Sequence, residues 1–398
     1  MSDTATTDRI QSLLRDNPMI DGHNDWVWQL RKFHGETWWN LDLTADARRF
    51  HPPLHTDIPR LRQGGLSGQF WAAWIPPNIT GAAAIQATLE QIDIIYGLAL
   101  RYPHMFEIAT TGDDIRRLHA TGKFASLIGI EGGHQIGNSL AALRQFFALG
   151  ARYMTLTHVK HTDWADCANL APVHNGMTDF GLAVIDEMNR LGMLVDLSHV
   201  SARVMDIALT RTKAPVIFSH SGARTLVDHT RNVADEILDR LPANGGVVMV
   251  IFYPVYINAA RFEWEAARIG EEACTGDYFA GQPERAAAAM TIWRASNPEP
   301  ATQISHVADH IDYIAQRIGY DHVGLGSDFD GIEVTPDQLD GVDGFPALLA
   351  ELIARGWSDE NLAKLMGSNV LRALDRAAEV AKGLNANLPS TATFSCGP

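Results

Sequence analysis

The sequence predicts an α/β protein in which eight parallel strands, with helices between them, close into one (β/α)8 barrel similar to the TIM barrel. Three observations lead to this prediction. Short apolar, β-branched runs alternate with longer stretches of helical period, which is the pattern of βα units around a parallel sheet. About eight such runs occur, the number that closes a barrel. Nearly every run ends in a residue that can bind a metal or move a proton, and the carboxyl ends of barrel strands share one face.

The expected strands are apolar runs that pass abruptly into polar or small residues. In chain order they are MIDGHND (19–25), GQFWAAW (68–74), ASLIGIEGG (125–133), YMTLTH (153–158), GMLVDLSH (192–199), APVIFSH (214–220), GVVMVIF (246–252) and HVGLGSDFD (322–330).

Stretches of helical period separate these runs. The expected helices span 81–101, 139–149, 179–191, 201–211, 232–241, 303–318 and 345–355. Several begin at a polar residue suited to cap a helix, such as Thr178 or Ser201. The segment at about 259–300, rich in Ala and Glu, is longer than one crossover requires, so we expect a helical insertion over the barrel mouth. We therefore expect a single catalytic domain over residues 1–385 and a loose tail over 386–398.

Composition and charge argue against a nucleic-acid-binding function. The 398 residues are 46% hydrophobic and 20% charged, which suits a large globular core. The 32 Lys and Arg against 47 Asp and Glu give a formal charge of −15. Because no basic cluster suits a phosphate backbone, we expect no nucleic-acid partner.

The N-terminus and the cysteines favour a cytoplasmic protein. The opening MSDTATTDRIQSLLRD is polar where a signal peptide needs an apolar core, and no later run reaches the roughly 18 apolar residues of a membrane span. We therefore expect no membrane partner. Cys167, Cys274 and Cys396 are too few and too scattered for a disulfide framework or a CxxC metal site. A reducing compartment fits them best.

The candidate functional residues stand at the ends of the expected strands. They are His23, Asp25, Glu131, His158, His199, His220, Asp328 and Asp330. Taken singly, each has another explanation: a histidine is usually hydrogen-bonded in a core or on a surface, and an aspartate can cap a helix. Glu131 could instead be a loop carboxylate that pairs with an arginine. Independent explanations would not all fall at the same end of successive strands, so together the residues indicate a metal site.

The ligand types point to paired divalent ions. Imidazole and carboxylate ligands without thiolate suit zinc first, with manganese or cobalt as alternatives. His23 and Asp25 are two positions apart, so on a strand they project from the same side and can bind one ion. Three histidines, one aspartate and a carboxylate able to bridge exceed the three protein ligands of a single open site, which favours two ions. Such ions lie roughly 3.5–4 Å apart, make a shared hydroxide at neutral pH and polarise the carbonyl that it attacks.

At this point the sequence resembles the membrane (renal) dipeptidases and their bacterial relatives, peptidase family M19 of the amidohydrolase superfamily. The matching motifs span most of the chain in order. They are DGHND (21–25), GGLSGQFW (64–71), IEGGH (130–134), LTHVKHTDWAD (156–166), DLSHVS (196–201), FSHSGAR (218–224), RNV (231–233), GGVVMVIFY (245–253) and GLGSDFDG (324–331).

The resemblance implies a barrel of the metal-dependent amidohydrolase type and a role for each site residue. It implies that His23 and Asp25 hold one zinc, that His199 and His220 hold the other, and that Glu131 bridges both, together with a hydroxide or water. Asp328 is then the catalytic acid and base, and His158 polarises the scissile carbonyl. Arg231 binds the α-carboxylate of a dipeptide substrate, because the planar fork of arginine matches a carboxylate at two points. Tyr253 and Tyr256 line the substrate pocket, although packing at the barrel rim explains them equally well. The resemblance also implies a homodimer.

The sequence departs from the family in places that bear on the substrate. Lys160 and His161 are expected to neighbour the substrate, and Trp26 and Trp28 are bulkier than the family's usual residues after DGHND. The signal peptide and lipid-anchor signal of the mammalian members are absent, so we do not expect the membrane part of the family name to apply. Two other functions stay open: a metal-dependent amidohydrolase acting on N-acyl amino acids or cyclic amides, and an inactive zinc-binding protein. Asp328 argues against the second, because a scaffold needs no acid and base.

Overall fold

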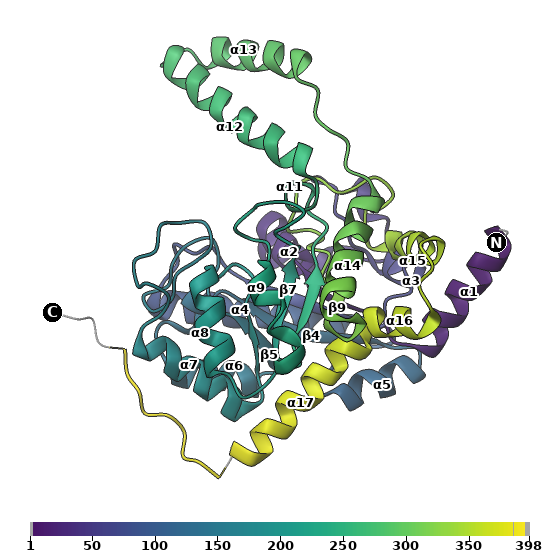
Figure 1. The fold of residues 1–398 in the computed structure, drawn as a ribbon, viewed down its shortest axis with the longest axis vertical. Coiled ribbons are helices and arrows are strands. Elements are labelled where there is room, and N and C mark those ends of the chain that lie inside the picture. The colour runs from purple at the N-terminus through teal and green to yellow at the C-terminus, as the bar shows by residue number, and fades with distance from the viewer. Residues whose placement is uncertain (1–2, 385, 395–398) are drawn as a thin grey trace.

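A closed barrel of eight parallel strands forms the centre of the molecule (Figure 1). The computed structural model describes residues 3–384 and 386–394. The strands are β1 (Ile20–Asn24), β2 (Gly68–Trp74), β3 (Phe106–Ile108), β4 (Phe124–Glu131), β5 (Ala151–Thr155), β6 (Leu194–Asp196), β7 (Val216–Ser221), β8 (Val247–Val250) and β9 (Val323–Leu325). Around the barrel the order is β1, β2, β4, β5, β6, β7, β8, β9, and β9 pairs again with β1. The predicted (β/α)8 fold is confirmed, with a strand in each of the eight predicted runs.

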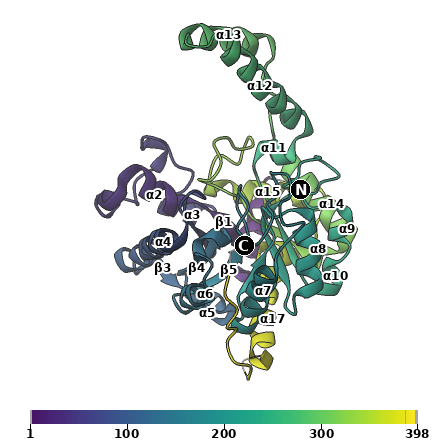
Figure 2. The same ribbon diagram turned by 90° about the vertical axis from the view of Figure 1, so that its left-hand side faces the viewer.

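Helices surround the barrel on its outer side (Figures 1 and 2). They are α1 (Asp3–Asp16), α2 (Trp26–His34), α3 (Ile58–Gln63), α4 (Gly81–Arg101), α5 (Gly112–Ala120), α6 (Leu140–Ala148), α7 (Asp179–Leu191), α8 (Ala202–Arg211), α9 (Asp235–Leu238), α10 (Leu241–Asn244), α11 (Pro254–Ile257), α12 (Ala259–Tyr278), α13 (Pro283–Ser296), α14 (Ile304–Ile318), α15 (Phe345–Ala354), α16 (Asp359–Ala363) and α17 (Asn369–Leu384). Short 3₁₀ turns cover Gly35–Asn40, Ala47–Arg49, Gly133–Ile136, Tyr320–His322 and Val342–Gly344, and a π-helical turn covers Lys364–Ser368. Thr178 and Ser201 cap α7 and α8 through their side chains, as predicted.

Large side chains fill the barrel interior where glycines leave room for them. A Cβ at Gly129 would lie 2.1 Å from Cζ of Tyr153, and a Cβ at Gly22 would lie 2.5 Å from Sδ of Met249. Both large side chains are fully buried. They belong to a core cluster that also includes Leu371 of α17, so this helix covers the amino end of the barrel. The carboxyl end of the barrel is not covered by this helix, and the candidate functional residues lie there.

Several elements differ from the sequence predictions. One predicted helix is divided, and the predictions did not include strand β3 or helices α1, α2, α3, α5, α11, α16 and α17. The predicted helix 232–241 is two short helices, α9 and α10, because Pro242 in the first turn of α10 cannot continue a preceding helix. Helix α17 was not predicted, although its buried residues at 370, 371, 374, 377 and 381 follow a helical period. Strand β3 was also not predicted. It has only three residues and pairs outside the barrel with the first half of β4.

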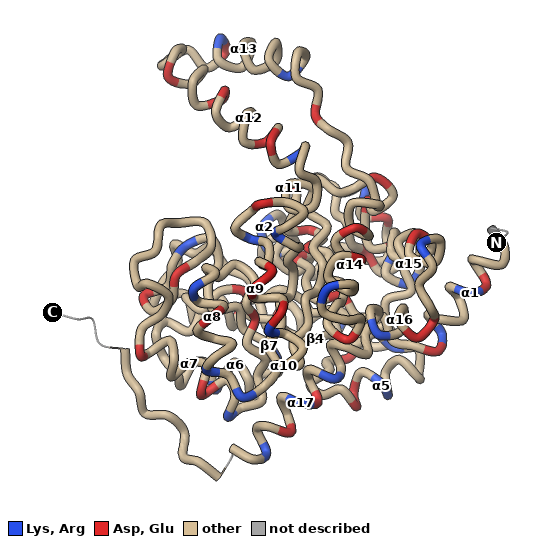
Figure 3. The backbone as a smooth tube through the Cα atoms, viewed as in Figure 1, with Lys and Arg blue, Asp and Glu red and all other residues tan. Residues whose placement is uncertain are grey.

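The α12–α13 hairpin occupies the segment in which we expected a helical insertion. The hairpin projects away from the barrel, and α12 and α13 pack chiefly on each other and on α11 (Figures 1 and 2). Its base is fastened by a hydrogen bond from Trp264 Nε1 to the carbonyl of Asn297. Figure 3 shows Lys and Arg interspersed with Asp and Glu along most of the chain. None of the described helices has the length and apolar character of a membrane span.

Candidate active site

The candidate residues come from six different strands and meet at the carboxyl end of the barrel. His23 lies on β1, Glu131 is the last residue of β4, and His220 lies on β7. The remaining members lie just beyond a strand: Asp25 follows β1, and His158, His199 and Asp328 each stand three residues after β5, β6 and β9. The predicted strands are therefore at least three residues too long at these positions, because His158, His199 and Asp328 belong to the loops that follow the strands. The predicted convergence of the side chains is nevertheless present.

Glu131 is at the centre of this cluster, and its two carboxylate oxygens face different neighbours. Oε2 lies 3.4 Å from Nε2 of His23. Oε1 lies 3.1 Å from Nε2 of His199, 3.5 Å from Nε2 of His220 and 3.6 Å from Nε2 of His158. No arginine is paired with Glu131 in the described part of the chain, so the alternative of a simple loop ion pair does not apply.

The Oε2 side of Glu131 combines His23 with two aspartates. Nε2 of His23 lies 3.3 Å from Oδ2 of Asp25 and 4.0 Å from Oδ1 of Asp328. The other ring nitrogen of His23 is 2.9 Å from the hydroxyl of Tyr153, which fixes the ring and leaves Nε2 directed at the carboxylates. Asp25 occupies the N-cap position of α2 but makes no capping hydrogen bond with its side chain, so its carboxylate is available to the site.

The Oε1 side of Glu131 brings two imidazole nitrogens together. Nε2 of His199 lies 2.8 Å from Nε2 of His220. Asp196 accepts a hydrogen bond of 2.6 Å from the hydroxyl of Ser219, and the Ser219 hydroxyl oxygen lies 2.8 Å from Nδ1 of His220. Because the hydroxyl proton of Ser219 points to Asp196, its oxygen accepts from His220, which places the proton of His220 on Nδ1 and a lone pair on Nε2. Burial lowers the pKa of both His199 and His220 well below the usual value, so both rings are neutral and can act as ligands.

The carboxylates give the site an excess of negative charge. Burial, reinforced by the charge of Glu131, raises the pKa of Asp25 to about 6. Burial also raises the pKa of Asp328 well above its usual value, and the nearby Asp25 and Glu131 add to this effect. Burial opposes the charged form of Glu131 as well, but His23 and His158 outweigh it and hold its pKa well below the usual value. A bound cation would relieve the repulsion among these groups.

The donor set fits divalent ions. Three overlapping groups have ligand atoms within 4.8 Å of one another: His23, Glu131 and His220; Glu131, His158 and His199; and His23, Asp25 and Asp328. Nε2 of His23 is buried and has no hydrogen-bond partner among the described residues, which is the expected state of a ligand atom directed at an ion. Nitrogen and oxygen donors without thiolate suit zinc and its divalent rivals.

Three residues of the site adopt left-handed backbone conformations that side chains usually avoid. His199, Asp328 and Asp330 have φ values of 66°, 64° and 64°. Such conformations cost about 1–3 kcal/mol each and persist where the surroundings enforce them. Gly331 is required beside them, because a Cβ at this position would lie 2.3 Å from carboxylate oxygens of both Asp25 and Asp328. The turns after β6 and β9 therefore aim their side chains at the cluster.

Arg231 lies beside the cluster as a buried cation. The side chain is 1% exposed, and its Nε and Nη1 atoms have no hydrogen-bond partner in the described structure. Nη2 donates a 3.4 Å hydrogen bond to the carbonyl of His220. The guanidinium carbon lies 5.5 Å from the ring centre of Tyr256, which in turn packs against Tyr253 at 4.9 Å. Unpaired donors on a buried guanidinium are suited to bind an anion.

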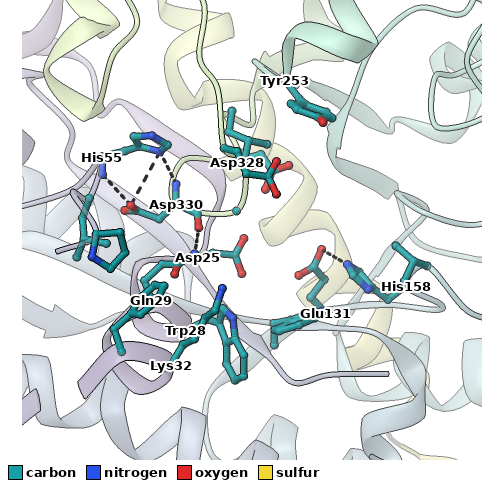
Figure 4. Close-up of a pocket in the computed structure, with 18 of the residues that line it drawn as sticks. Asp25, Trp28, Gln29, Lys32, His55, Glu131, His158, Tyr253, Asp328 and Asp330 are labelled. Carbon is teal, nitrogen blue, oxygen red and sulfur yellow. Dashed lines mark hydrogen bonds and ion pairs between the residues drawn. The ribbon is translucent and has the colours of Figure 1, made fainter. Parts of the chain in front are cut away.

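A cavity of about 640 Å³ opens above these residues (Figure 4). Its lining includes the predicted residues Asp25, Glu131, His158, His199, Arg231, Tyr253, Tyr256, Asp328 and Asp330. Lys160 and His161, which we expected near the substrate, are not among the lining residues. Instead, His161 accepts a hydrogen bond from the amide of Cys167 and organises its own loop. Trp28 lines the cavity, whereas Trp26 is fully buried in the core.

Sequence reasoning missed the residues that hold the site in place. Tyr153, Asp196 and Ser219 orient the histidines, and Trp74, the last residue of β2, lines the cavity beside His158 with ring centres 5.4 Å apart. The second predicted strand, like the seventh, has no polar end, so nothing in its pattern pointed to Trp74. Asp196 stands three residues before His199 and Ser219 directly precedes His220, and a polar residue so close to a candidate histidine ligand is the signal that could have identified each of them.

A barrel whose strand ends bring four imidazoles and three carboxylates together, namely His23, His158, His199, His220, Asp25, Glu131 and Asp328, defines a hydrolase of the metal-dependent amidohydrolase type. Comparison with known proteins narrows this class. Residues 7–388 match the model of the membrane dipeptidase family, peptidase family M19. The chain therefore belongs to the membrane dipeptidase family and is a metal-dependent hydrolase of the dipeptidase class, as its motifs predict.

Fungal proteins are among its relatives. The chain is 39% identical to the dipeptidase verJ of Clonostachys rogersoniana over 379 residues, which cover 92% of this chain and 86% of the relative. It is 38% identical to the dipeptidase tcpJ of Claviceps purpurea over 382 residues, which cover 93% of this chain and 79% of the relative.

Solved structures share the fold at lower identity. The probable dipeptidase PvdM of Pseudomonas aeruginosa superposes with a TM-score of 0.79 at 24% identity and covers 95% of this chain and 100% of its own. A metallopeptidase of Rhodobacter sphaeroides, solved with a phosphinate mimic of the dipeptide L-Ala-D-Ala, superposes with a TM-score of 0.73 at 24% identity and covers 91% of this chain and 99% of its own.

Proposed function

We propose that this protein is a binuclear zinc dipeptidase that cleaves L-Xaa-L-Xaa and L-Xaa-D-Xaa dipeptides. The observation that carries the proposal is the position of Glu131, whose two oxygens face two separate sets of ligands. A carboxylate in that position can bridge two ions, whereas a single-ion site would need only one of its faces.

The ligand sets divide on either side of Glu131. His23 and Asp25 would hold one ion with Oε2 of Glu131, and His199 and His220 would hold the other with Oε1. When bound, paired divalent ions supply a nucleophile at neutral pH and polarise the carbonyl that it attacks. Zinc is the ion that the donor set favours, with manganese and cobalt as alternatives.

Asp328 is the group that we propose to move the proton. It accepts a proton as the nucleophile forms and passes it to the leaving amine of the second residue. Its carboxylate lies 4.0 Å from His23 and lines the cavity, so it can reach the reacting atoms. Burial raises its pKa well above the usual value, which suits a carboxylate that must hold a proton during the reaction.

His158 and Arg231 would position the substrate. Burial lowers the pKa of His158, so its ring is neutral and can donate a hydrogen bond to the scissile carbonyl and to the oxyanion that develops there. The unpaired Nε and Nη1 atoms of Arg231 would bind the α-carboxylate of the second residue. Tyr253 and Tyr256 line the same side of the cavity and would contact that residue.

A panel of stereoisomers tests this function. We expect cleavage of L-Ala-L-Ala and L-Ala-D-Ala and little or no cleavage of D-Ala-L-Ala. The amine and carbonyl of the first residue would be held at the metal site, whereas inversion at the second residue exchanges a side chain for a hydrogen and leaves the carboxylate near Arg231. Values of kcat/KM for the three peptides decide it. Rapid cleavage of D-Ala-L-Ala without cleavage of L-Ala-D-Ala would show that the substrate binds in the opposite direction.

N-acetyl amino acids added to the same panel separate the alternative amidohydrolase function. Asp25, Asp328 and Asp330 all line the cavity and can bind a free α-amine, which a dipeptide has and an N-acyl amino acid lacks. We therefore expect N-acetyl-L-Ala to be a poor substrate. Faster turnover of N-acetyl-L-Ala than of L-Ala-L-Ala would favour the alternative.

Three broader expectations belong to this proposal. We propose a cytoplasmic enzyme, which the free Cys167 and Cys274 support; a homodimer, which family resemblance supports; and one catalytic domain over residues 1–385, with the insertion at about 259–300 and the tail at 386–398. Light scattering on the purified chain measures the oligomeric state directly.

A further inference from the structure

One wall of the cavity is apolar and has no role in the reaction proposed above. Trp28 and Phe33 of α2 and Pro52, Pro53 and Leu54 of the following loop line it; we call these residues the α2 wall. Phe33 is 42% exposed although phenylalanine is usually buried. Trp28 packs edge-on against Trp74, with ring centres 4.6 Å apart, so the apolar surface continues toward His158. Contiguous exposed apolar surface within a cavity is typical of a binding site.

The topology places the α2 wall across the barrel from the proposed carboxylate site. Arg231 follows β7, and α2 connects β1 with β2. In the closed order of eight strands, β1, which α2 directly follows, is three positions from β7, and β2, on which α2 packs, is four positions from it. Figure 4 agrees, because Trp28, Gln29 and Lys32 lie on the opposite side of Asp25 from Tyr253. A dipeptide anchored at Arg231 by its second residue therefore directs its first residue toward α2.

The groups between these two walls fix which part of the first residue meets the α2 wall. Asp25 immediately precedes α2 and lines the cavity, so the proposed metal site lies beside this helix. With the amine and the carbonyl of the first residue held at that site, its α-carbon has only a hydrogen and the side chain left, and the side chain is the substituent large enough to reach the α2 wall. The cavity volume of about 640 Å³ falls within the range that encloses drug-sized ligands, so a large side chain can be accommodated.

We propose that the α2 wall is a subsite for the side chain of the first residue, and that the enzyme selects dipeptides whose first residue is large and apolar or aromatic. This inference rests on the proposed dipeptidase function. Apolar surface of Trp28 and Phe33 would be removed from water by such a side chain, and in a hydrophobic pocket each added methylene can change kcat/KM by roughly 10-fold or more.

Lys32 provides the competing prediction. It lines the cavity from the same helix and is exposed, and its ammonium lies 4.8 Å from the ring centre of Phe33. If Lys32 determined specificity, the preferred first residue would be acidic. We expect the apolar surface to dominate, because an exposed ammonium in water gains little from pairing with a carboxylate.

A series of dipeptides with a constant second residue tests the proposal. We expect kcat/KM for L-Phe-L-Ala and L-Leu-L-Ala to exceed that for Gly-L-Ala by at least about 10-fold, with L-Glu-L-Ala below L-Phe-L-Ala. The reversed series, L-Ala-Gly and L-Ala-L-Phe, should show a smaller spread. Equal values throughout the first series, a maximum at L-Glu-L-Ala, or a preference confined to the second position would each overturn the proposal. If no dipeptide were cleaved at all, the proposed function itself would fail.

A pair of variants assigns the preference to the wall. In Phe33→Ala, the ratio of kcat/KM for L-Phe-L-Ala to that for Gly-L-Ala should fall by at least about 5-fold, on the scale expected for lost contacts in a hydrophobic pocket. Phe33 is exposed, so the variant should fold. Tyr278→Ala is the matched control, because Tyr278 is an aromatic residue of α12 that is 87% exposed and does not line the cavity. The control should leave the ratio unchanged. An unchanged ratio in Phe33→Ala would overturn the assignment.

Discussion

Individual side chains in this site are held by neighbours that leave one functional atom free. Tyr153 bonds one nitrogen of His23 and Ser219 bonds one nitrogen of His220, so that in each ring the other nitrogen faces Glu131. Arg231 is held through its backbone amide, which donates to His229, while two of its guanidinium nitrogens have no partner in the described structure. Each arrangement orients a side chain without using the atom on which the proposed chemistry depends.

Replacement of Asp328 tests the proposed proton transfer. Asp328→Asn should leave the fold and most of the bound metal in place and lower kcat by at least roughly 100-fold, because an amide cannot carry the proton. Asp330→Asn serves as the comparison, since the Asp330 carboxylate already accepts a 2.7 Å hydrogen bond from the amide of His55. Steady-state kinetics with saturating metal give the answer. Near-normal turnover in Asp328→Asn would shift the assignment to Asp330.

Replacement of Arg231 tests recognition of the carboxylate. Arg231→Met keeps much of the side-chain volume but removes the charge-assisted pair, so kcat/KM should fall by the equivalent of about 2–4 kcal/mol for a largely desolvated pair. Dipeptides with an amidated C-terminus are the control. They should be poor substrates of the unmodified enzyme and should be affected little by the substitution. Equal cleavage of free-acid and amidated dipeptides by the unmodified enzyme would contradict this role.

At the scale of elements, the strands were easier to predict from sequence than the turns that follow them. Apolar runs mark each barrel strand, but nothing in such a run shows at which residue the strand ends. At His199 and Asp328 the chain has already left the strand and adopted a left-handed turn, which depends on tertiary contacts rather than on local preference. Strand β3 was not predicted for the same reason, because its three residues form a strand only by pairing with β4. By contrast, the buried residues of α17 follow a clear helical period, so this helix was predictable from sequence.

The α12–α13 hairpin provides a prediction at this scale. Replacement of residues 266–295 by a short Gly-Ser linker should leave the barrel folded, because these helices pack chiefly on each other and on α11. The linker would join segments already held together by the bond between Trp264 and Asn297. We expect Tm to change by less than about 5 °C, as measured by calorimetry on both metal-loaded proteins. An unfolded product would show that the segment is part of the barrel's own core and not an insertion.

At the scale of the whole molecule, the barrel gives the site its composition. Residues from His23 to Asp328, far apart in the sequence, meet because all barrel strands present their carboxyl ends on one face. This is why the convergence of these side chains could be predicted from strand ends alone. The hydrogen bonds by which Tyr153 and Asp196 help to orient the histidines could not be predicted, because hydrogen bonds between side chains of different strands leave no periodic signal in the sequence.

Metal content per chain tests the central claim most directly. Elemental analysis of the purified protein, combined with an activity assay of the same sample, should find about two divalent ions per chain. Glu131→Gln should disturb both sites, whereas His199→Ala should mainly weaken one and retain about one ion, because a bridging carboxylate serves two ions and a terminal imidazole serves one. Circular dichroism confirms that the variants are folded. A metal-free protein with full activity, or Glu131→Gln protein that retains two ions, would contradict the account.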